Sequence, residues 1–106
     1  MNTPSNLSPP ESMTEAIARL DKLGYRETFR GEASGKLRAL SNHDVYDAHD
    51  FHIDEVVRFE GDTNLEDESV IFALRHIKSD LKGTYTIAYS TNMQSEDLDV
   101  MQALQT

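Results

Sequence analysis

The sequence predicts an α+β fold with an N-terminal helix, an antiparallel β-meander of about five strands and a short C-terminal helix. Two apolar, β-prone runs at residues 51–59 and 69–78 flank an acidic segment, which is typical of a long antiparallel hairpin. Apolar residues also recur at helical spacing near both ends of the chain, over residues 13–23 and 95–104. Helices at the two ends of a run of strands indicate the α+β class.

The length of 106 residues suits a single domain. We expect this domain to span residues 11–106. Residues 1–10, where Pro9 and Pro10 stand among small polar residues, are expected to form a disordered tail.

Local signals place the two helices. Ser12 and Glu15 have the spacing of a capping box, and Gly24 suits a left-handed residue after the helix end. Ser95 is the expected N-cap of the last helix. Gly31, Gly35 and the glycine of the later SDLKG stretch are expected in turns. The remaining elements are expected as strands at 27–32 and 35–40, a polar loop with one helical turn at 41–50, a tight turn at 79–83 and a last strand at 84–90.

Strand periodicity separates two faces of the sheet. A register that places Phe59 opposite Val70 would pair Asp54 with Arg75 across strands. The apolar face is expected under the helices and comprises Phe51, Ile53, Val57, Phe59, Val70, Phe72, Leu74, Tyr85, Ile87 and Tyr89. The opposite face carries an apolar strip of Val56, Ile71, Ala73 and Ile77. Either another segment covers this strip or a second chain does, and a homodimer through this mixed face is slightly favoured.

The net charge of −9 lies in one part of the chain. Between His43 and Ser69 there are ten acidic residues and one basic residue, whereas the rest has nine of each. Such a field repels nucleic acid and anionic membranes, so neither is expected as a partner. A basic protein partner or a cation fits better, and a solvated surface that maintains solubility is the simpler alternative.

The chain has no cysteine, which excludes disulfides, thiolate nucleophiles and cysteine-bearing zinc sites. No apolar run approaches the roughly 20 residues of a membrane helix. The first ten residues have neither the basic region nor the apolar core of a secretory signal. We therefore expect a cytoplasmic protein, and no cofactor is predicted.

Two groups of residues are candidate sites. The first is an acidic recognition surface at the hairpin loop, where the acids would meet a basic protein; it comprises Arg58, Glu60, Asp62, Glu66, Asp67 and Glu68. The second is a divalent-metal site, because imidazoles and carboxylates are zinc ligands and a helical turn over 47–52 would put two histidines on one side. It comprises His43, Asp47, His49 and His52. General acid–base work by His76 with Tyr85 is a third possibility.

The stretch Arg58-Phe59-Glu60-Gly61-Asp62, followed by Asp67-Glu68 and later by KGTYTIAYS, resembles a family of small uncharacterised bacterial proteins with an RFEGD-x-x-x-x-DE motif. The resemblance covers about half the chain and implies a shared fold. Some members carry the label phosphoribosylpyrophosphate synthetase. That activity is not expected here, because the nearest stretch, residues 80–84, lacks the paired acids and helix of such a site. Leu65 also replaces the family's proline.

Three functions therefore remain open. The first is a small non-catalytic interaction or regulatory domain, of which an anionic mimic of nucleic acid is one version. The second is a metal-binding protein, and the third is a metal-dependent enzyme. Whether the chain is an enzyme at all is uncertain from its sequence.

Overall fold

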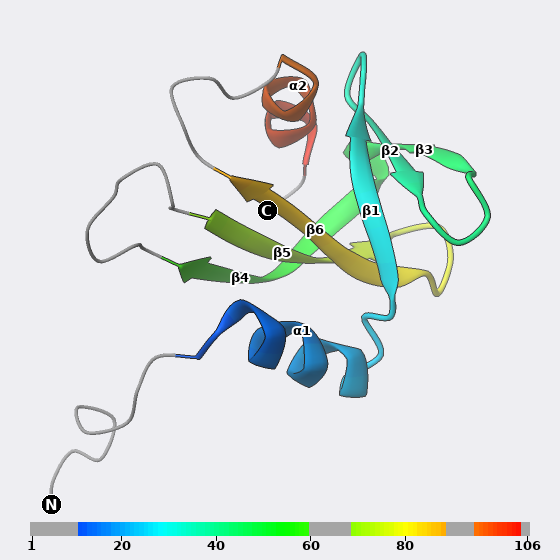
Figure 1. Cartoon of the computed structure of the whole chain (residues 1–106). Helices are drawn as coiled ribbons and strands as arrows, with labels where there is room; N and C mark the ends of the chain where they lie inside the picture. The colour runs from blue at the N-terminus through cyan, green and yellow to red at the C-terminus, as the bar shows by residue number, and fades with distance from the viewer. Residues whose placement is uncertain (1–10, 60–68, 89–94, 105–106) are drawn as a thin grey trace, which may run out of the picture.

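The structure is a computed structural model that describes residues 11–59, 69–88 and 95–104. The expected tail, the hairpin loop at 60–68 and the linker after β6 lie outside these residues. The described elements run in chain order as α1 (Met13–Lys22), β1 (Glu27–Glu32), β2 (Lys36–Ala39), β3 (Val45–Asp47), the 3-10 helix η2 (Ala48–Asp50), β4 (Phe51–Phe59), β5 (Ser69–His76), β6 (Lys82–Ala88) and α2 (Ser95–Ala103) (Figure 1).

The described strands form one six-stranded sheet in the order β3-β2-β1-β6-β5-β4. The α+β class and the two terminal helices are confirmed. The purely antiparallel meander is wrong in one respect, because β1 and β6 pair in parallel while the other neighbours are antiparallel. The sixth strand is β3, which lies in the segment expected to be a loop. It has only three residues and no apolar run, so period-two patterning did not reveal it.

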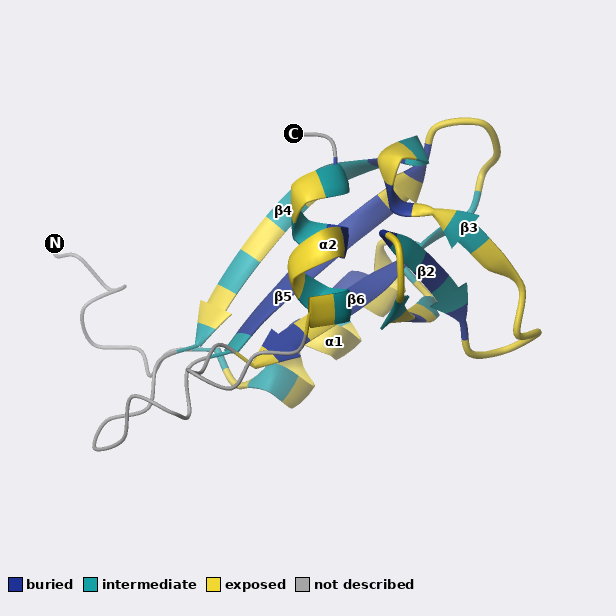
Figure 2. Cartoon of the chain, turned by 90° about the horizontal axis from the view of Figure 1, so that it is seen from above, coloured by how far each residue is buried: buried dark blue, intermediate teal, exposed yellow. Residues whose placement is uncertain are grey.

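The two helices cover opposite faces of the sheet, with α1 below it and α2 above it in Figure 1. The strand β5, which lies between β6 and the edge strand β4, is consequently buried on both sides, as the dark ribbon in Figure 2 shows. Its residues Val70, Phe72 and Leu74 join the cluster that contains Val100 of α2. The alternate residues Ile71 and Ala73 join Ala16 and Leu20 of α1 in a second cluster.

A β-bulge in β4 corrects the predicted faces. The register with β5 shifts between Ile53 and Glu55, so that Asp54 is the extra residue. Phe51 and Ile53 therefore pack with the α2 cluster, whereas Val57 and Phe59 pack with the α1 cluster. Assigning all four to one face was wrong, because strict alternation holds only for a strand without a bulge.

The bulge also changes the strand register and the apolar strip. Phe59 lies opposite Ser69, one residue from its expected partner Val70. Val56 pairs with Phe72 and is thus on the α2 face, 45% exposed. Ile71 and Ala73, the centre of the strip, are covered by α1 of the same chain. Helix α1 therefore covers the centre of the apolar strip, and no second chain is needed there. The homodimer stays a prediction, but the exposed strip no longer supports it.

Helix α1 forms as its capping signals predict. The Ser12 side chain accepts a hydrogen bond from the Glu15 amide at 3.1 Å, and Glu15 accepts one from the Ser12 amide at 2.9 Å. Gly24 has φ +103°, the left-handed conformation that glycine adopts most easily. Ala16 and Leu20 are the helix residues that become fully buried.

Helix α2 is attached to the sheet by a polar contact as well as by Val100. The Tyr85 hydroxyl, from the centre of β6, donates a hydrogen bond of 2.5 Å to Asp97 Oδ1. Any side chain at position 31 would place its Cβ atom 2.5 Å from that carboxylate oxygen, which is too close. Gly31 is a strand residue, not the expected turn residue, and its lack of a side chain leaves room for Asp97.

The parallel pair of β1 and β6 depends on a second close approach. Gly83 lies within β6 opposite Glu27 and is buried. A Cβ there would overlap the carbonyl oxygen of Glu27 and lie 2.7 Å from the ring of Phe29. The prediction that Gly83 is a turn residue is therefore wrong. Its lack of a side chain allows the backbones of β1 and β6 to pack closely.

We expect Gly83→Ala to reduce the free energy of unfolding by about 1–3 kcal/mol, the usual range for overpacking, because backbone atoms of Glu27 must move. Urea denaturation at pH 7 measures this. Thr86→Ala, on an exposed position of the same strand, serves as the control and should change stability by less than about 0.5 kcal/mol. Equal stability of the Gly83 variant and the wild type would contradict the close approach.

Candidate functional site

The acidic segment is carried between β4 and β5, an antiparallel pair that is in register from Glu55 to Phe59. Arg58 is exposed near the end of β4, which is an edge strand of the described sheet. The other residues of the predicted recognition surface, Glu60, Asp62, Glu66, Asp67 and Glu68, lie outside the described residues. The sequence between Phe59 and Ser69 nevertheless contains five acids and no base in nine residues.

Half of the basic residues form ion pairs with carboxylates of the described residues. All ten lysines and arginines lie in the described ranges. Five of them pair with carboxylates there, namely Arg19 with Glu11 and Glu55, Lys36 with Asp47, Arg38 with Glu32, Arg75 with Asp54, and Lys78 with Asp50. Among described residues Arg58 has no carboxylate partner. The basic residues thus offset acids within the folded scaffold.

The four candidate metal ligands do not converge. Residues 48–50 form a 3-10 turn and His52 belongs to β4, so the helical turn expected over 47–52 does not form. His52 Nδ1 lies 2.9 Å from Asp54 Oδ1, and Asp47 is paired with Lys36. His43 has φ +64° in the turn before β3, and His49 lies in η2. In the described part of the chain no three histidine or carboxylate side chains are grouped to hold a metal ion.

The pairing of His76 with Tyr85 is also wrong. Tyr85 lies opposite Phe72, and His76 lies opposite Phe51. His76 Nδ1 is 2.9 Å from Ser79 Oγ, and its ring contacts Tyr46 and Phe51. His76 is buried in this aromatic surround, while burial and the bond to Asp97 hold the pKa of Tyr85 well above its ordinary value.

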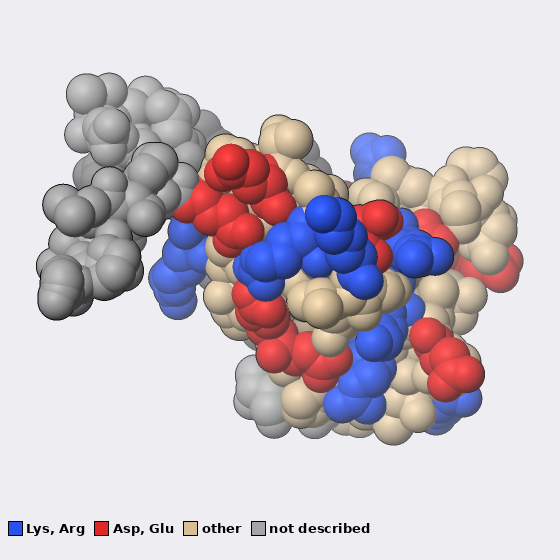
Figure 3. All heavy atoms as spheres, turned by 90° about the horizontal axis from the view of Figure 1, so that it is seen from below, with Lys and Arg blue, Asp and Glu red and all other residues tan. Residues whose placement is uncertain are grey.

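Charged side chains of both signs are interleaved on the face of the molecule that Figure 3 shows from below. At the bulge two consecutive carboxylates, Asp54 and Glu55, contact α1 and the segment that follows it. Asp54 accepts hydrogen bonds from the Tyr25 hydroxyl at 2.7 Å and from Arg75 Nε at 3.3 Å. The expected ion pair of Asp54 with Arg75 is thus present, although the register that predicted it is wrong, because Arg75 lies opposite His52.

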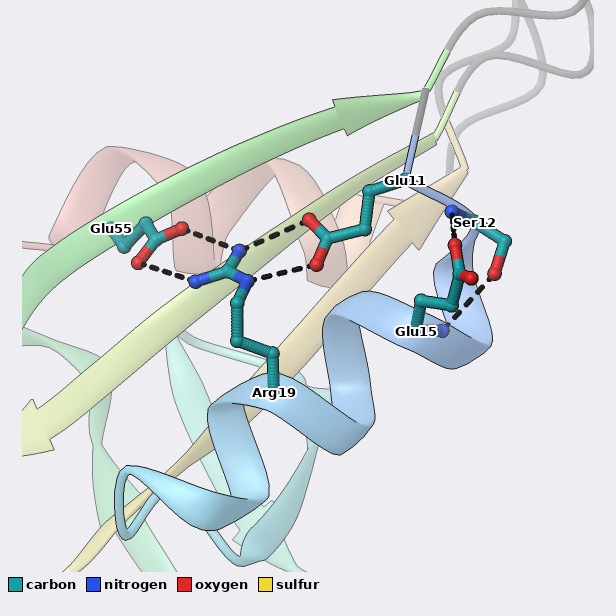
Figure 4. Close-up of polar contacts among 5 residues, drawn as sticks. All are labelled: Glu11, Ser12, Glu15, Arg19 and Glu55. Carbon is teal, nitrogen blue, oxygen red and sulfur yellow. Dashed lines mark hydrogen bonds and ion pairs between the residues drawn. The ribbon is translucent and has the colours of Figure 1, made fainter. Parts of the chain in front are cut away.

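Glu55 is held by the guanidinium of Arg19, which projects from α1 between two carboxylates (Figure 4). Arg19 Nη2 donates to Glu55 at 2.7 Å, and Arg19 Nε donates to Glu11 at 2.8 Å. These groups are about one-third exposed, so each pair contributes on the order of 0–1 kcal/mol. The arrangement fixes the position of α1 more than it adds stability.

The hydrogen bonds around Asp54 attach neighbouring elements to one another and do not suit proton transfer. Burial disfavours the charged form of Asp54, but the donors Tyr25, His52 and Arg75 outweigh it and hold the pKa of Asp54 below its ordinary value. Burial and the bond to Asp54 raise the pKa of Tyr25 to about 12. An ionised acid and a protonated phenol at pH 7 are a stable donor–acceptor pair and are poor proton-transfer groups.

A hollow of about 550 Å³ opens beside this network. It lies where the segment after α1, the turn after β2 and the turn before β6 meet. Its charged lining residues are Arg26, Glu27, Asp80 and Lys82. No local sequence pattern predicts the hollow, because its walls come from three segments that are distant in sequence. One related signal in the sequence is the gathering of four basic residues, Arg26, Arg30, Lys36 and Arg38, of which Arg26 lines the hollow.

The chain matches no known family model, no curated protein and no solved structure. The resemblance to the RFEGD family therefore stays a prediction. Among the described helices, none has the length and apolar character needed to cross a membrane.

Asp54→Asn is expected to lower stability at pH 7 and to have a smaller effect in acid. Because the folded pKa of Asp54 lies below its unfolded value of about 3.9, its stabilisation is complete above that value and is lost as the pH falls through the folded pKa. The difference in unfolding free energy between wild type and variant, measured by urea denaturation from pH 7 to pH 2.5, should shrink below about pH 4. Asp99→Asn, on the exposed side of α2, is the control. A pH-independent difference for Asp54→Asn would contradict an ionised, hydrogen-bonded carboxylate.

Proposed function

We propose that this chain is a small non-catalytic interaction domain that binds a basic protein surface through its acidic hairpin loop. The recognition surface is Arg58 together with Glu60, Asp62, Glu66, Asp67 and Glu68. The same proposal places the protein in the cytoplasm.

The observation that carries the proposal is the unequal distribution of compensating charge. The described residues contain ten bases and fourteen acids, and five of those bases are in ion pairs. Residues 60–68 add five acids with no base. About half of the net charge is thus concentrated in nine residues between two paired strands. An uncompensated charge of this density accelerates association with a partner of opposite sign and selects against one of like sign.

The two strands that flank the acidic segment are held in place by the sheet and its core. β4 and β5 are paired along most of their length, and β5 is buried between both helices. Loops carried on such a scaffold are common positions for recognition residues. The groups that the sequence suggested for metal binding and acid–base catalysis are separated or engaged elsewhere, so the acidic segment is the candidate that retains support.

The test compares two variants of equal charge change. The first replaces Asp62, Glu66, Asp67 and Glu68 by serine. The second replaces four exposed acids outside the loop, Asp21, Asp44, Asp80 and Asp99, by serine. Binding of a fluorescent peptide rich in lysine and arginine is measured by anisotropy at several salt concentrations.

We expect the loop variant to bind about tenfold more weakly, since each exposed ion pair contributes on the order of 0.2–1 kcal/mol. The control variant should bind nearly as well as the wild type, and added salt should weaken wild-type binding. Equal losses in both variants would show that net charge alone attracts the peptide and would refute a specific loop surface. Absence of wild-type binding at low salt would also refute it.

A further inference from the structure

The hollow beside α1 brings together two positive charges that form no ion pair with a carboxylate among the described residues. β1 and β6 are parallel here, with Glu27 opposite Gly83. The residues immediately before these two, Arg26 and Lys82, therefore occupy neighbouring positions at the start of the pair, and both line the hollow. Like charges in neighbouring strand positions are unfavourable unless an opposite charge lies between them.

The present contacts of these two cations are long. Arg26 Nε lies 3.4 Å from the carbonyl oxygen of Asp21, and Lys82 Nζ lies 3.5 Å from that of Leu23. Lys82 Nζ is also 4.8 Å from the centre of the Tyr25 ring. Both carbonyls belong to the C-terminal end of α1, where a positive charge is favourable. Contacts at the distance limit leave most of the N–H donors of both side chains available.

The two acids in the hollow do not neutralise the pair. Glu27 accepts hydrogen bonds from the Ser41 hydroxyl at 2.6 Å and from the amides of Ser41 and Thr28 at 3.1 Å. These bonds overcome the effect of burial and lower the pKa of Glu27. Asp80 is exposed at the rim and is in no ion pair with another described residue. Glu27 thus fixes the wall of the hollow, while Asp80 is a free acceptor at its edge.

We propose that the hollow is a binding site for a small organic anion, in which Arg26 and Lys82 hold the carboxylate or phosphate group. Arginine presents paired N–H donors to such groups, and lysine adds a point charge. Asp80 then accepts a hydrogen bond from a hydroxyl or ammonium group elsewhere on the ligand. The volume of about 550 Å³ is in the range of metabolite-sized sites.

Charge and shape define the class of ligand further. The hollow is partly apolar, because Leu40 and Leu81 contribute to its lining. A short aliphatic carboxylate or a small phosphate ester therefore fits better than a bare ion. The net charge of −9 opposes long polyanions such as nucleic acid, while a small anion experiences mainly the two nearby cations.

The test is a titration of the full chain followed by amide chemical shifts in two-dimensional NMR. Inorganic phosphate, acetate and butyrate are added separately against sodium chloride at equal ionic strength. The amides of Gly24 and Ser41 report on the hollow, and that of Val100 reports on the distant α2. Three double variants are compared. R26Q/K82Q removes both charges, R26K/K82R preserves them, and K22Q/R30Q removes two cations that do not line the hollow.

We expect saturable shifts at Gly24 and Ser41 with phosphate or a carboxylate, and none at Val100. Stronger binding of butyrate than acetate identifies a carboxylate with an apolar chain, and stronger binding of phosphate identifies a phosphate ester. Affinity should fall by about tenfold or more in R26Q/K82Q and be largely retained in the other two variants. Should R26Q/K82Q fail to fold, R26Q alone should show a clear part of the loss.

Three results would overturn the proposal. The first is a wild type whose shifts do not saturate with any of the anions or are the same in chloride. The second is full affinity in folded R26Q/K82Q, or in R26Q where that double variant does not fold. The third is an equal loss in K22Q/R30Q, which would attribute binding to overall charge and not to this hollow.

Discussion

The burial of β5 on both faces is the constraint on which the rest of the structure depends. Its residues alternate between two apolar clusters, so neither face of the sheet can be left in water. A chain of this length has two helices in its described part, and it uses one for each face. The three-layer arrangement follows from that requirement. It also explains why α1, although first in the sequence, packs against a strand that lies about fifty residues later.

The bulge at Asp54 allows the edge strand β4 to supply apolar residues to both clusters that β5 joins. Without it, β4 would present Phe51, Ile53, Val57 and Phe59 to the same side and would leave Val56 as its one apolar residue on the α1 side. With it, the strand serves both clusters and turns two consecutive carboxylates toward α1. A bulge in an edge strand also makes the edge less regular and hence a poorer template for pairing with other chains.

Electrostatics divides the molecule into parts with different roles. On the described scaffold, acids and bases are paired in cross-element contacts that orient α1, β2 and β3. Charges of one sign lie close together at two places. The segment at residues 60–68 has acids without bases, and the hollow beside α1 has two neighbouring bases that form no ion pair with another described residue. These are the two places where our functional proposals lie, and they call for partners of opposite charge and very different size.

The sequence by itself determined the local features. It specified the capping box of α1, the two β-prone runs of the central hairpin, the α+β class and the concentration of acid in one region. Each of these depends on residues close in the chain, where spacing and propensity act directly. Only the tertiary structure decided the parallel pairing of β1 with β6, the bulge at Asp54 and the meeting of Arg26 with Lys82. These features join segments separated by tens of residues. Local propensity does not distinguish between different strand pairings and registers, and the burial of β5 favours one of them.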